Sequence, residues 1–298
     1  MYANALLGVW PYIFQDNPCL RKLYNVYSRF TFYYFILFII SAIMELFILV
    51  ADDENRTEEI VANLCITLIY IITAVRVYVM RSTTIRNLIK QILATEDAIL
   101  KNDDEEIMEI YKFHARQSQI TNLIFIVNIT VETIFFFTHP LYVDEKIKFN
   151  KATNETKVIK ALPLSSWFPY DPQDHYLASY MWHIFDGTVG ASYVMYTDAY
   201  NFSLIIFPLG QIRILTHVLS NFPRYVLKVK DQLQCSRDEA SFITLRECIL
   251  KHKEIMRYLQ EYNDSMKNIM LLDFLQSSLQ LASVVIQLFV VCITYTAC

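Results

Sequence analysis

The sequence predicts an all-α protein, a polytopic bundle of transmembrane helices. Of its 298 residues, 54% are hydrophobic and 19% are charged, whereas a soluble domain carries about a quarter charged residues. The apolar residues also cluster in runs long enough to cross a bilayer, which takes about 20 helical residues at about 1.5 Å each. No repeat or low-complexity linker divides the chain, so residues 1–298 are predicted to form a single transmembrane domain.

Five segments have the length and composition of membrane spans. They cover residues 31–50, 60–80, 120–138, 181–214 and 269–295, to within a few residues. Arg76, near the end of the second span, is expected to extend its guanidinium to the lipid headgroups. The fourth span holds three of the four glycines of the chain, Gly187, Gly190 and Gly210. Because small residues let helices approach closely, this span is expected to organise the bundle.

Long helices are predicted to extend spans three to five on the cytoplasmic side. The acidic run 102–106 supplies a cap and first-turn acids for a helix that leads into the third span. Ser236 and Glu239 have the spacing of a capping box. No breaker separates the apolar stripe that follows from the fifth span, so one helix is expected to continue from the cytoplasm into the membrane.

The distribution of basic residues and two glycosylation motifs predict the orientation. With a cytoplasmic N-terminus, 19 of the 26 Lys and Arg residues lie on the inner side and six on the outer side. Asn55 and Asn154 begin Asn-x-Thr motifs in the two loops that this orientation places outside. We therefore expect a multi-pass plasma-membrane glycoprotein that is embedded in the lipid bilayer and has its N-terminus in the cytoplasm.

The motifs of enzymes, metal sites and nucleic-acid-binding proteins are missing from the sequence. It contains no G-x-S-x-G, H-E-x-x-H, Walker or G-x-G-x-x-G pattern, so neither a catalytic residue nor a cofactor is predicted. Its six cysteines form no C-x-x-C pair, its histidines form no i, i+4 pair, and the acids at 102–106 are expected to be a solvated helix start. The net charge of −4 does not indicate a basic, nucleic-acid-binding protein.

Several short motifs, in this order and spacing, resemble those of the insect odorant receptor family over essentially the whole chain. They are Leu7-Gly8-Val9-Trp10-Pro11, the loop 162–171 with Tyr176, Tyr180 and His183, Thr197-Asp198-Ala199, Gln211-Ile212-Arg213-Ile214-Leu215, His252-Lys253-Glu254-Ile255 and Phe274-Leu275-Gln276-Ser277-Ser278. The cytoplasmic N-terminus is also similar to that of the family.

The resemblance implies an odorant-binding subunit of an odorant-gated, non-selective cation channel in the dendrite of an olfactory sensory neuron. Subunits of this family have seven spans and form hetero-tetramers with a shared co-receptor subunit. The sequence differs from the family in ending at Cys298, just after the fifth span. The expectation at this point is a truncated chain that lacks the last two spans, including the pore lining, and that does not conduct ions as written.

The resemblance places the odorant among the outer halves of the spans, and helical spacing indicates which residues there share a face. On spans two, three and four the candidate ligand-binding residues are Ile66, Ile69, Tyr70, Asn128, Val131, Phe135, Gly190 and Val194. Tyr70 and Asn128 could each orient a ligand by one hydrogen bond. The alternative for each residue is ordinary helix packing.

Three other functions remain open at this level. A regulatory fragment could co-assemble without conducting, and a gustatory-type receptor would share the fold. A secondary transporter could use the intramembrane acids Glu132 and Asp198, although structural pairing is the preferred explanation for both. The absence of an inverted repeat disfavours the transporter.

The predicted topology can be tested in intact cells. A tag at Met1 should become accessible to antibody only after permeabilisation, because the N-terminus is cytoplasmic. Asn154 should carry a glycan, so glycosidase treatment should lower the apparent mass of the wild-type chain more than that of Asn154→Gln. A tag that is accessible from outside intact cells would contradict this topology.

Overall fold

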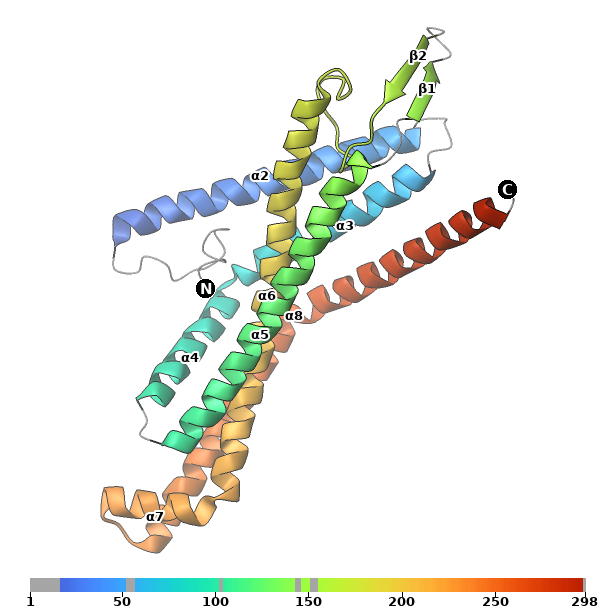
Figure 1. Ribbon diagram of the computed structural model, residues 1–298. Helices are drawn as coiled ribbons and strands as arrows, with labels where there is room; N and C mark the ends of the chain where they lie inside the picture. Colours follow the sequence, from blue (N-terminus) through green and yellow to red (C-terminus); the bar gives the residue numbers. More distant parts are fainter. Residues whose placement is uncertain (1–16, 52–56, 102–103, 143–145, 151–154, 297–298) are drawn as a thin grey trace. The chain divides into compact units, whose positions relative to one another are not determined.

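The computed structural model describes residues 17–51, 57–101, 104–142, 146–150 and 155–296 (Figure 1). Asn55 and Asn154, the predicted glycosylation sites, lie outside these residues. The elements in chain order are α2 (Pro18–Ala51), α3 (Thr57–Met80), α4 (Thr83–Leu100), α5 (Glu105–Thr138), the 3-10 turn η1 (His139–Leu141), β1 (Lys146–Asn150), β2 (Glu155–Ile159), α6 (Tyr176–Ser220), α7 (Phe222–Leu233) and α8 (Arg237–Thr296).

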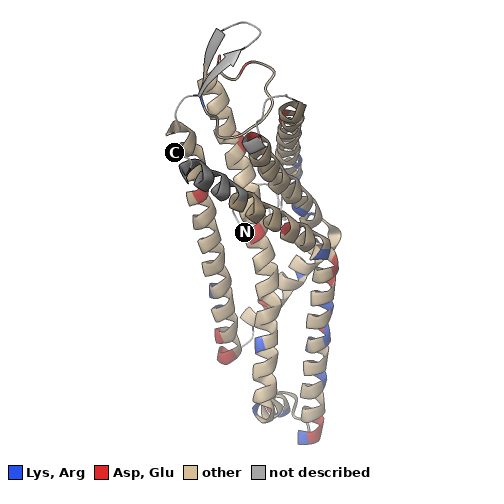
Figure 2. Ribbon diagram, turned by 90° about the vertical axis from the view of Figure 1, so that its right-hand side faces the viewer, with Lys and Arg blue, Asp and Glu red and all other residues tan. Residues whose placement is uncertain are grey.

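Five helices of the described chain, α2, α3, α5, α6 and α8, are long and apolar enough to cross a membrane. Each of the five predicted spans lies within one of them, so the predicted all-α, polytopic fold is confirmed. The predicted extension of spans three to five is also confirmed, because α5, α6 and α8 contain 34, 45 and 60 residues. At about 1.5 Å per residue, α8 is about 90 Å long. Figure 2 shows that its charged residues gather in its first half.

Side-chain caps define where the cytoplasmic helices begin. Asp104 Oδ1 accepts a hydrogen bond from the Ile107 backbone N–H at 3.3 Å at the start of α5. Ser236 Oγ accepts one from the Glu239 backbone N–H at 3.2 Å at the start of α8. Both caps satisfy N–H groups that have no partner within the helix. The two helix starts that the sequence predicted are therefore confirmed.

A short hairpin interrupts the loop between α5 and α6. β1 and β2 pair antiparallel, with Lys146 opposite Ile159 and Asn150 opposite Glu155. The sequence predicted no strand between the third and fourth spans. The missed signal is the alternation of polar and apolar residues in Lys146-Ile147-Lys148-Phe149, which is typical of a strand with one apolar face.

The chain divides into two compact units, to both of which α5, α6 and α8 contribute. The first unit comprises Met1–Tyr78, Ile126–Thr197 and Asn268–Cys298, and the second comprises Val79–Phe125 and Asp198–Lys267. The core of the first unit is aromatic and aliphatic, and consists of Phe35, Phe38, Ile39, Tyr70, Ala74, Val77, Leu164 and Tyr193. The single domain predicted from the sequence stays a prediction.

In the second unit, an ion pair with one buried member joins the start of α5 to α7. Lys228 Nζ lies 3.1 Å from Asp104 Oδ2, and the Asp104 side chain is 5% exposed. Burial raises the pKa of Asp104, but the hydrogen bonds from Lys228 and from the Ile107 N–H outweigh it and bring the pKa below its usual range. The nearby pair of Glu106 and Arg224 is much more exposed and adds less, because exposed pairs contribute about 0–1 kcal/mol.

Replacing Asp104 should therefore destabilise the protein in a pH-dependent way. Asp104→Ala should cost about 1–2 kcal/mol at neutral pH through loss of the cap. Because the folded pKa is depressed, the carboxylate stabilises fully above its unfolded pKa of about 4 and loses this effect as pH falls through the folded value. Thermal unfolding in detergent should show a gap between wild type and variant that closes in acid. Glu105→Ala, an exposed neighbour in the same turn, is the matched control, and an equal loss in both variants would contradict the assignment.

Candidate functional site

Four aromatic rings fill the space between α2, α3 and α6 in the first unit. Phe35 stacks on Tyr193 with ring centroids 4.8 Å apart, and meets Tyr70 edge-on at 5.7 Å. Phe38 meets the same Tyr70 ring edge-on at 5.4 Å. Such pairs add about 0.5–1.5 kcal/mol each beyond area burial. The rings therefore hold Tyr70 firmly in one place.

Tyr70 lies directly against the backbone of α6 at Gly190. A Cβ atom at position 190 would lie 2.6 Å from Tyr70 Cε1 and 2.9 Å from its hydroxyl oxygen. These distances are shorter than carbon atoms tolerate, so the observed position of the ring requires glycine there. Phe35 and Phe38 contact the ring as well, so it has little room to withdraw.

Five of the eight predicted ligand-binding residues gather at this cluster. Tyr70 lies within it, and Ile66, Ile69 and Val194 pack against it as partly buried side chains. Gly190 contacts it through the close approach of Tyr70. The faces that helical spacing indicated on α3 and α6 therefore meet, and the odorant-binding role of these residues stays a prediction.

The three residues predicted on α5 lie apart from the cluster. Asn128 is exposed, Val131 is 44% exposed and Phe135 is 69% exposed. In the first unit α5 contacts α6 at Phe137, whose carbonyl accepts a hydrogen bond from the Tyr180 hydroxyl at 2.7 Å. Phe137 is nine residues from Asn128, which in an α-helix is two and a half turns. The ligand-binding role proposed for these three residues stays a prediction that no contact in the first unit supports.

The buried face of α6 carries polar residues that the sequence analysis did not single out as a set. Alternating steps of four and three residues join Ser179, His183, Asp186, Gly190, Tyr193 and Thr197. This spacing keeps side chains on one helix face. Ser179 and His183 are 0% exposed, Thr197 is 1% and Asp186 is 3%. The repeat was visible in the sequence, because Ser179 and Asp186 lie seven residues apart, and His183 and Thr197 fourteen, within an apolar segment.

These polar residues bond to other parts of the first unit. The Tyr34 hydroxyl on α2 donates to Asp186 Oδ1, and Ser166 Oγ lies 2.8 Å from His183 Nε2. Buried polar groups are costly without such partners, so each bond fixes the rotation of α6 about its axis.

The loop before α6 is built into the same unit. Leu164 is 6% exposed and belongs to the core. Asn63 Nδ2 donates to the Ser165 carbonyl at 2.9 Å, and the Trp167 N–H donates to the Ser41 carbonyl at 3.1 Å. These bonds attach the loop to α3 and α2, so it is part of the candidate site.

Arg76 is buried in the first unit, and the prediction that it extends to the headgroups is wrong. It is 7% exposed. Its Nη2 lies 2.6 Å from Asp273 Oδ1 on α8, and its Nη1 donates to Thr197 Oγ1 at 3.3 Å. A carboxylate and a hydroxyl from two other helices replace the lipid headgroup, because a guanidinium inside a bundle needs a counter-charge.

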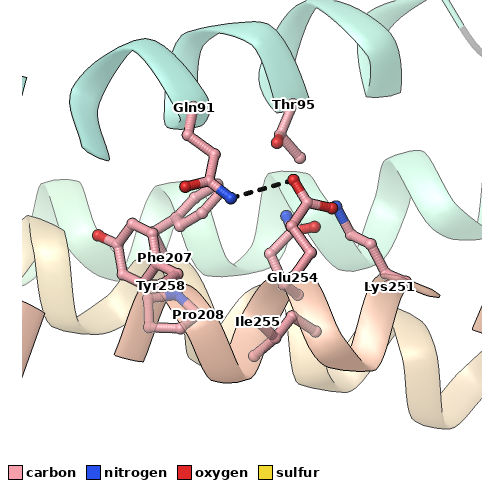
Figure 3. Close-up of a pocket in the computed structure, with 9 residues that line it drawn as sticks. Gln91, Thr95, Phe207, Pro208, Lys251, Glu254, Ile255 and Tyr258 are labelled. Atoms are coloured by element: carbon pink, nitrogen blue, oxygen red, sulfur yellow. Dashed lines mark hydrogen bonds and ion pairs between the residues drawn. The ribbon is translucent and has the colours of Figure 1, made fainter. Parts of the chain in front are cut away.

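The second unit contains a small pocket between α4, α6 and α8 (Figure 3). Glu254 Oε1 accepts a hydrogen bond from Gln91 Nε2 at 3.1 Å, and Glu254 Oε2 accepts one from Lys251 Nζ at 3.0 Å. Both carboxylate oxygens are therefore engaged by side chains of the chain itself. The arrangement serves the packing of these helices, and it contains none of the eight predicted ligand-binding residues.

Substitutions of two glycines on α6 should have opposite effects. Gly190→Ala should destabilise the protein, because overpacking costs about 1–3 kcal/mol and exceeds the gain of about 1 kcal/mol in helix propensity. Gly210→Ala should be neutral or stabilising, because its Cβ would lie 3.4 Å from His114 Cβ, an ordinary contact. Thermal unfolding of the purified variants measures both.

A double variant tests whether the Tyr70 ring causes the loss of stability expected of Gly190→Ala. Gly190→Ala combined with Tyr70→Leu should lose less stability than the two single changes added together, because removing the ring removes the clash. Strict additivity of the two losses of stability would show that the Tyr70 ring does not restrict the size of the side chain at position 190.

Comparisons with known proteins give the family. The structure of the insect olfactory receptor OR5 from Machilis hrabei aligns with a TM-score of 0.60 at 12% identity, covering 95% of this chain and 68% of that chain. The same receptor in complex with eugenol aligns with a TM-score of 0.58, also at 12% identity and with the same coverage. At this identity the likeness shows the fold alone, and no curated protein sequence matches the chain. The family model described as 7tm Odorant receptor matches residues 56–298, and the chain therefore belongs to the odorant receptor family.

Proposed function

We propose that this chain is the odorant-binding subunit of an odorant-gated, non-selective cation channel in the plasma membrane. The observation that carries the proposal is the family match over residues 56–298. The structural likeness to an insect olfactory receptor solved with eugenol, a small aromatic molecule, supports a ligand of that size and character. The second subunit of the channel is proposed to be an odorant co-receptor, in a hetero-tetramer.

The aromatic cluster of the first unit is the proposed ligand site. An odorant that buries about 200 Å² of apolar surface gains about 5 kcal/mol, which corresponds to a dissociation constant of about 0.2 mM. Burial alone therefore gives weak binding with little selectivity. Polar groups at the cluster, first of all the Tyr70 hydroxyl, would supply the selectivity.

The alternative functions have less support. The family match is to odorant receptors, which disfavours a gustatory-type receptor. Glu132, one of the two acids that suggested a transporter, is exposed on α5. A subunit that binds odorant without conducting remains the alternative that an experiment must separate from the channel.

Co-expression with a co-receptor subunit tests the proposal. Cells that express both chains should show cation currents evoked by volatile molecules, and the two chains should co-purify. Tyr70→Ala should raise the odorant concentration for half-maximal current about tenfold or more, because it removes a buried aromatic side chain from the site. Tyr78→Ala is the matched control, since Tyr78 lies on the same helix and is 72% exposed.

The results of this co-expression experiment distinguish a channel subunit from a non-conducting one and test the location of the ligand site. Co-purification without current would favour the non-conducting subunit. Currents that Tyr70→Ala and Tyr78→Ala change equally would reject the aromatic cluster as the ligand site.

A further inference from the structure

A carboxylate is buried beside the proposed ligand site. Asp186 lies on the inward face of α6 and is 3% exposed. The Tyr34 hydroxyl donates a hydrogen bond to its Oδ1. Among the residues that the structure describes, no donor contacts Oδ2. A carboxylate offers about four acceptor positions, so most of its capacity to accept hydrogen bonds is unused.

Burial of such a group is expensive. An unpaired carboxylate loses several kcal/mol on transfer from water to an apolar interior, and a single hydroxyl returns about 1.5–3 kcal/mol. An apolar pocket would gain nothing from an acid at this position. A molecule that donates a hydrogen bond to Oδ2 would recover part of the cost.

Aromatic side chains pack against the stretch of α6 beside Asp186. Gly187 and Gly190 lie there, and the rings of Phe137 and Tyr70 lie directly against them, so a molecule that reaches Oδ2 would contact these rings. The Tyr70 hydroxyl lies against Gly190, which is one turn of α6 from Asp186. Tyr34 itself is flanked by Phe185, with ring centroids 5.6 Å apart. An acceptor, a hydroxyl and aromatic rings therefore border the same stretch of helix.

We infer that Asp186 recognises odorants that carry an O–H or N–H donor, such as alcohols and primary amines, by accepting their hydrogen bond on Oδ2. The inference rests on the proposed odorant-binding function and names its ligand class. The competing explanation is structural, in which the bond from Tyr34 serves only to join α2 to α6.

Two variants distinguish ligand recognition by Asp186 from a purely structural role of its bond with Tyr34. Asp186→Asn keeps an oxygen that can accept from Tyr34 but presents an amide N–H₂ where Oδ2 was. It preserves the bond between α2 and α6 and removes the acceptor. Tyr34→Phe removes that bond and leaves the carboxylate in place.

The probes are phenylethyl alcohol, phenylethylamine and phenylethyl methyl ether, which share a skeleton and differ in donor capacity. Stabilisation of the purified full chain by each probe, followed by thermal unfolding in detergent, gives apparent affinities without any need for conduction. Wild type should bind the alcohol and the amine more tightly than the ether. Asp186→Asn should weaken both donors about tenfold or more relative to the ether, and Tyr34→Phe should retain the preference.

Three results would overturn the inference. They are equal stabilisation of wild type by all three probes, stabilisation of wild type by neither donor, and an equal loss for all three probes in Asp186→Asn. A larger loss for the amine than for the alcohol would show that the charge of the carboxylate contributes, and an equal loss for the two would show that its acceptor oxygen suffices. Absent currents with preserved donor preference would reject the proposed channel and leave this inference standing.

Discussion

A guanidinium inside an apolar bundle must have a counter-charge, and the pairing of Arg76 with Asp273 decides which faces of α3 and α8 meet. The two charged groups lie 2.6 Å apart, and Arg76 also bonds to Thr197 on α6. Separation of the pair would leave a buried charge, which costs about 3–5 kcal/mol. Apolar packing alone is far less selective, since a rotated helix would still present apolar residues. The ion pair therefore fixes the rotation of three helices at one point.

One face of α6 connects that point to the candidate ligand site. Thr197 accepts from Arg76, and its hydroxyl donates to the Tyr193 carbonyl at 2.8 Å, one turn earlier. Tyr193 stacks on Phe35 in the aromatic cluster. Gly190 follows one turn further toward Asp186. Any change in the rotation of α6 therefore alters the bond from Arg76 to Thr197 and the environment of Tyr70 together, because both depend on residues of one heptad face.

Local features of the fold were predictable from the sequence, and pairings between distant residues were not. Long apolar runs indicated the spans, and the caps at Asp104 and Ser236 indicated helix starts, because these signals act within a few residues. The partner of Arg76 is 197 positions away in the chain, so single-helix reasoning assigned it to the headgroups. On α3 and α6, helical spacing and the presence of a glycine indicated faces that the structure brings together at Tyr70 and Gly190.

The residues on α5 show why the remaining part of the site was beyond sequence reasoning. In a soluble helix the apolar stripe identifies the buried face. In a membrane the lipid is as apolar as the protein interior, so Val131 and Phe135 could equally face lipid or a neighbouring helix. A face that packs against another helix is marked by residues that a lipid-facing surface would not tolerate, such as an acid, or would not require, such as a glycine. Asp186 and Gly190 are such residues, and the contacts of the first unit are specified by a few polar and small side chains of this kind, with the larger apolar ones filling the space between them.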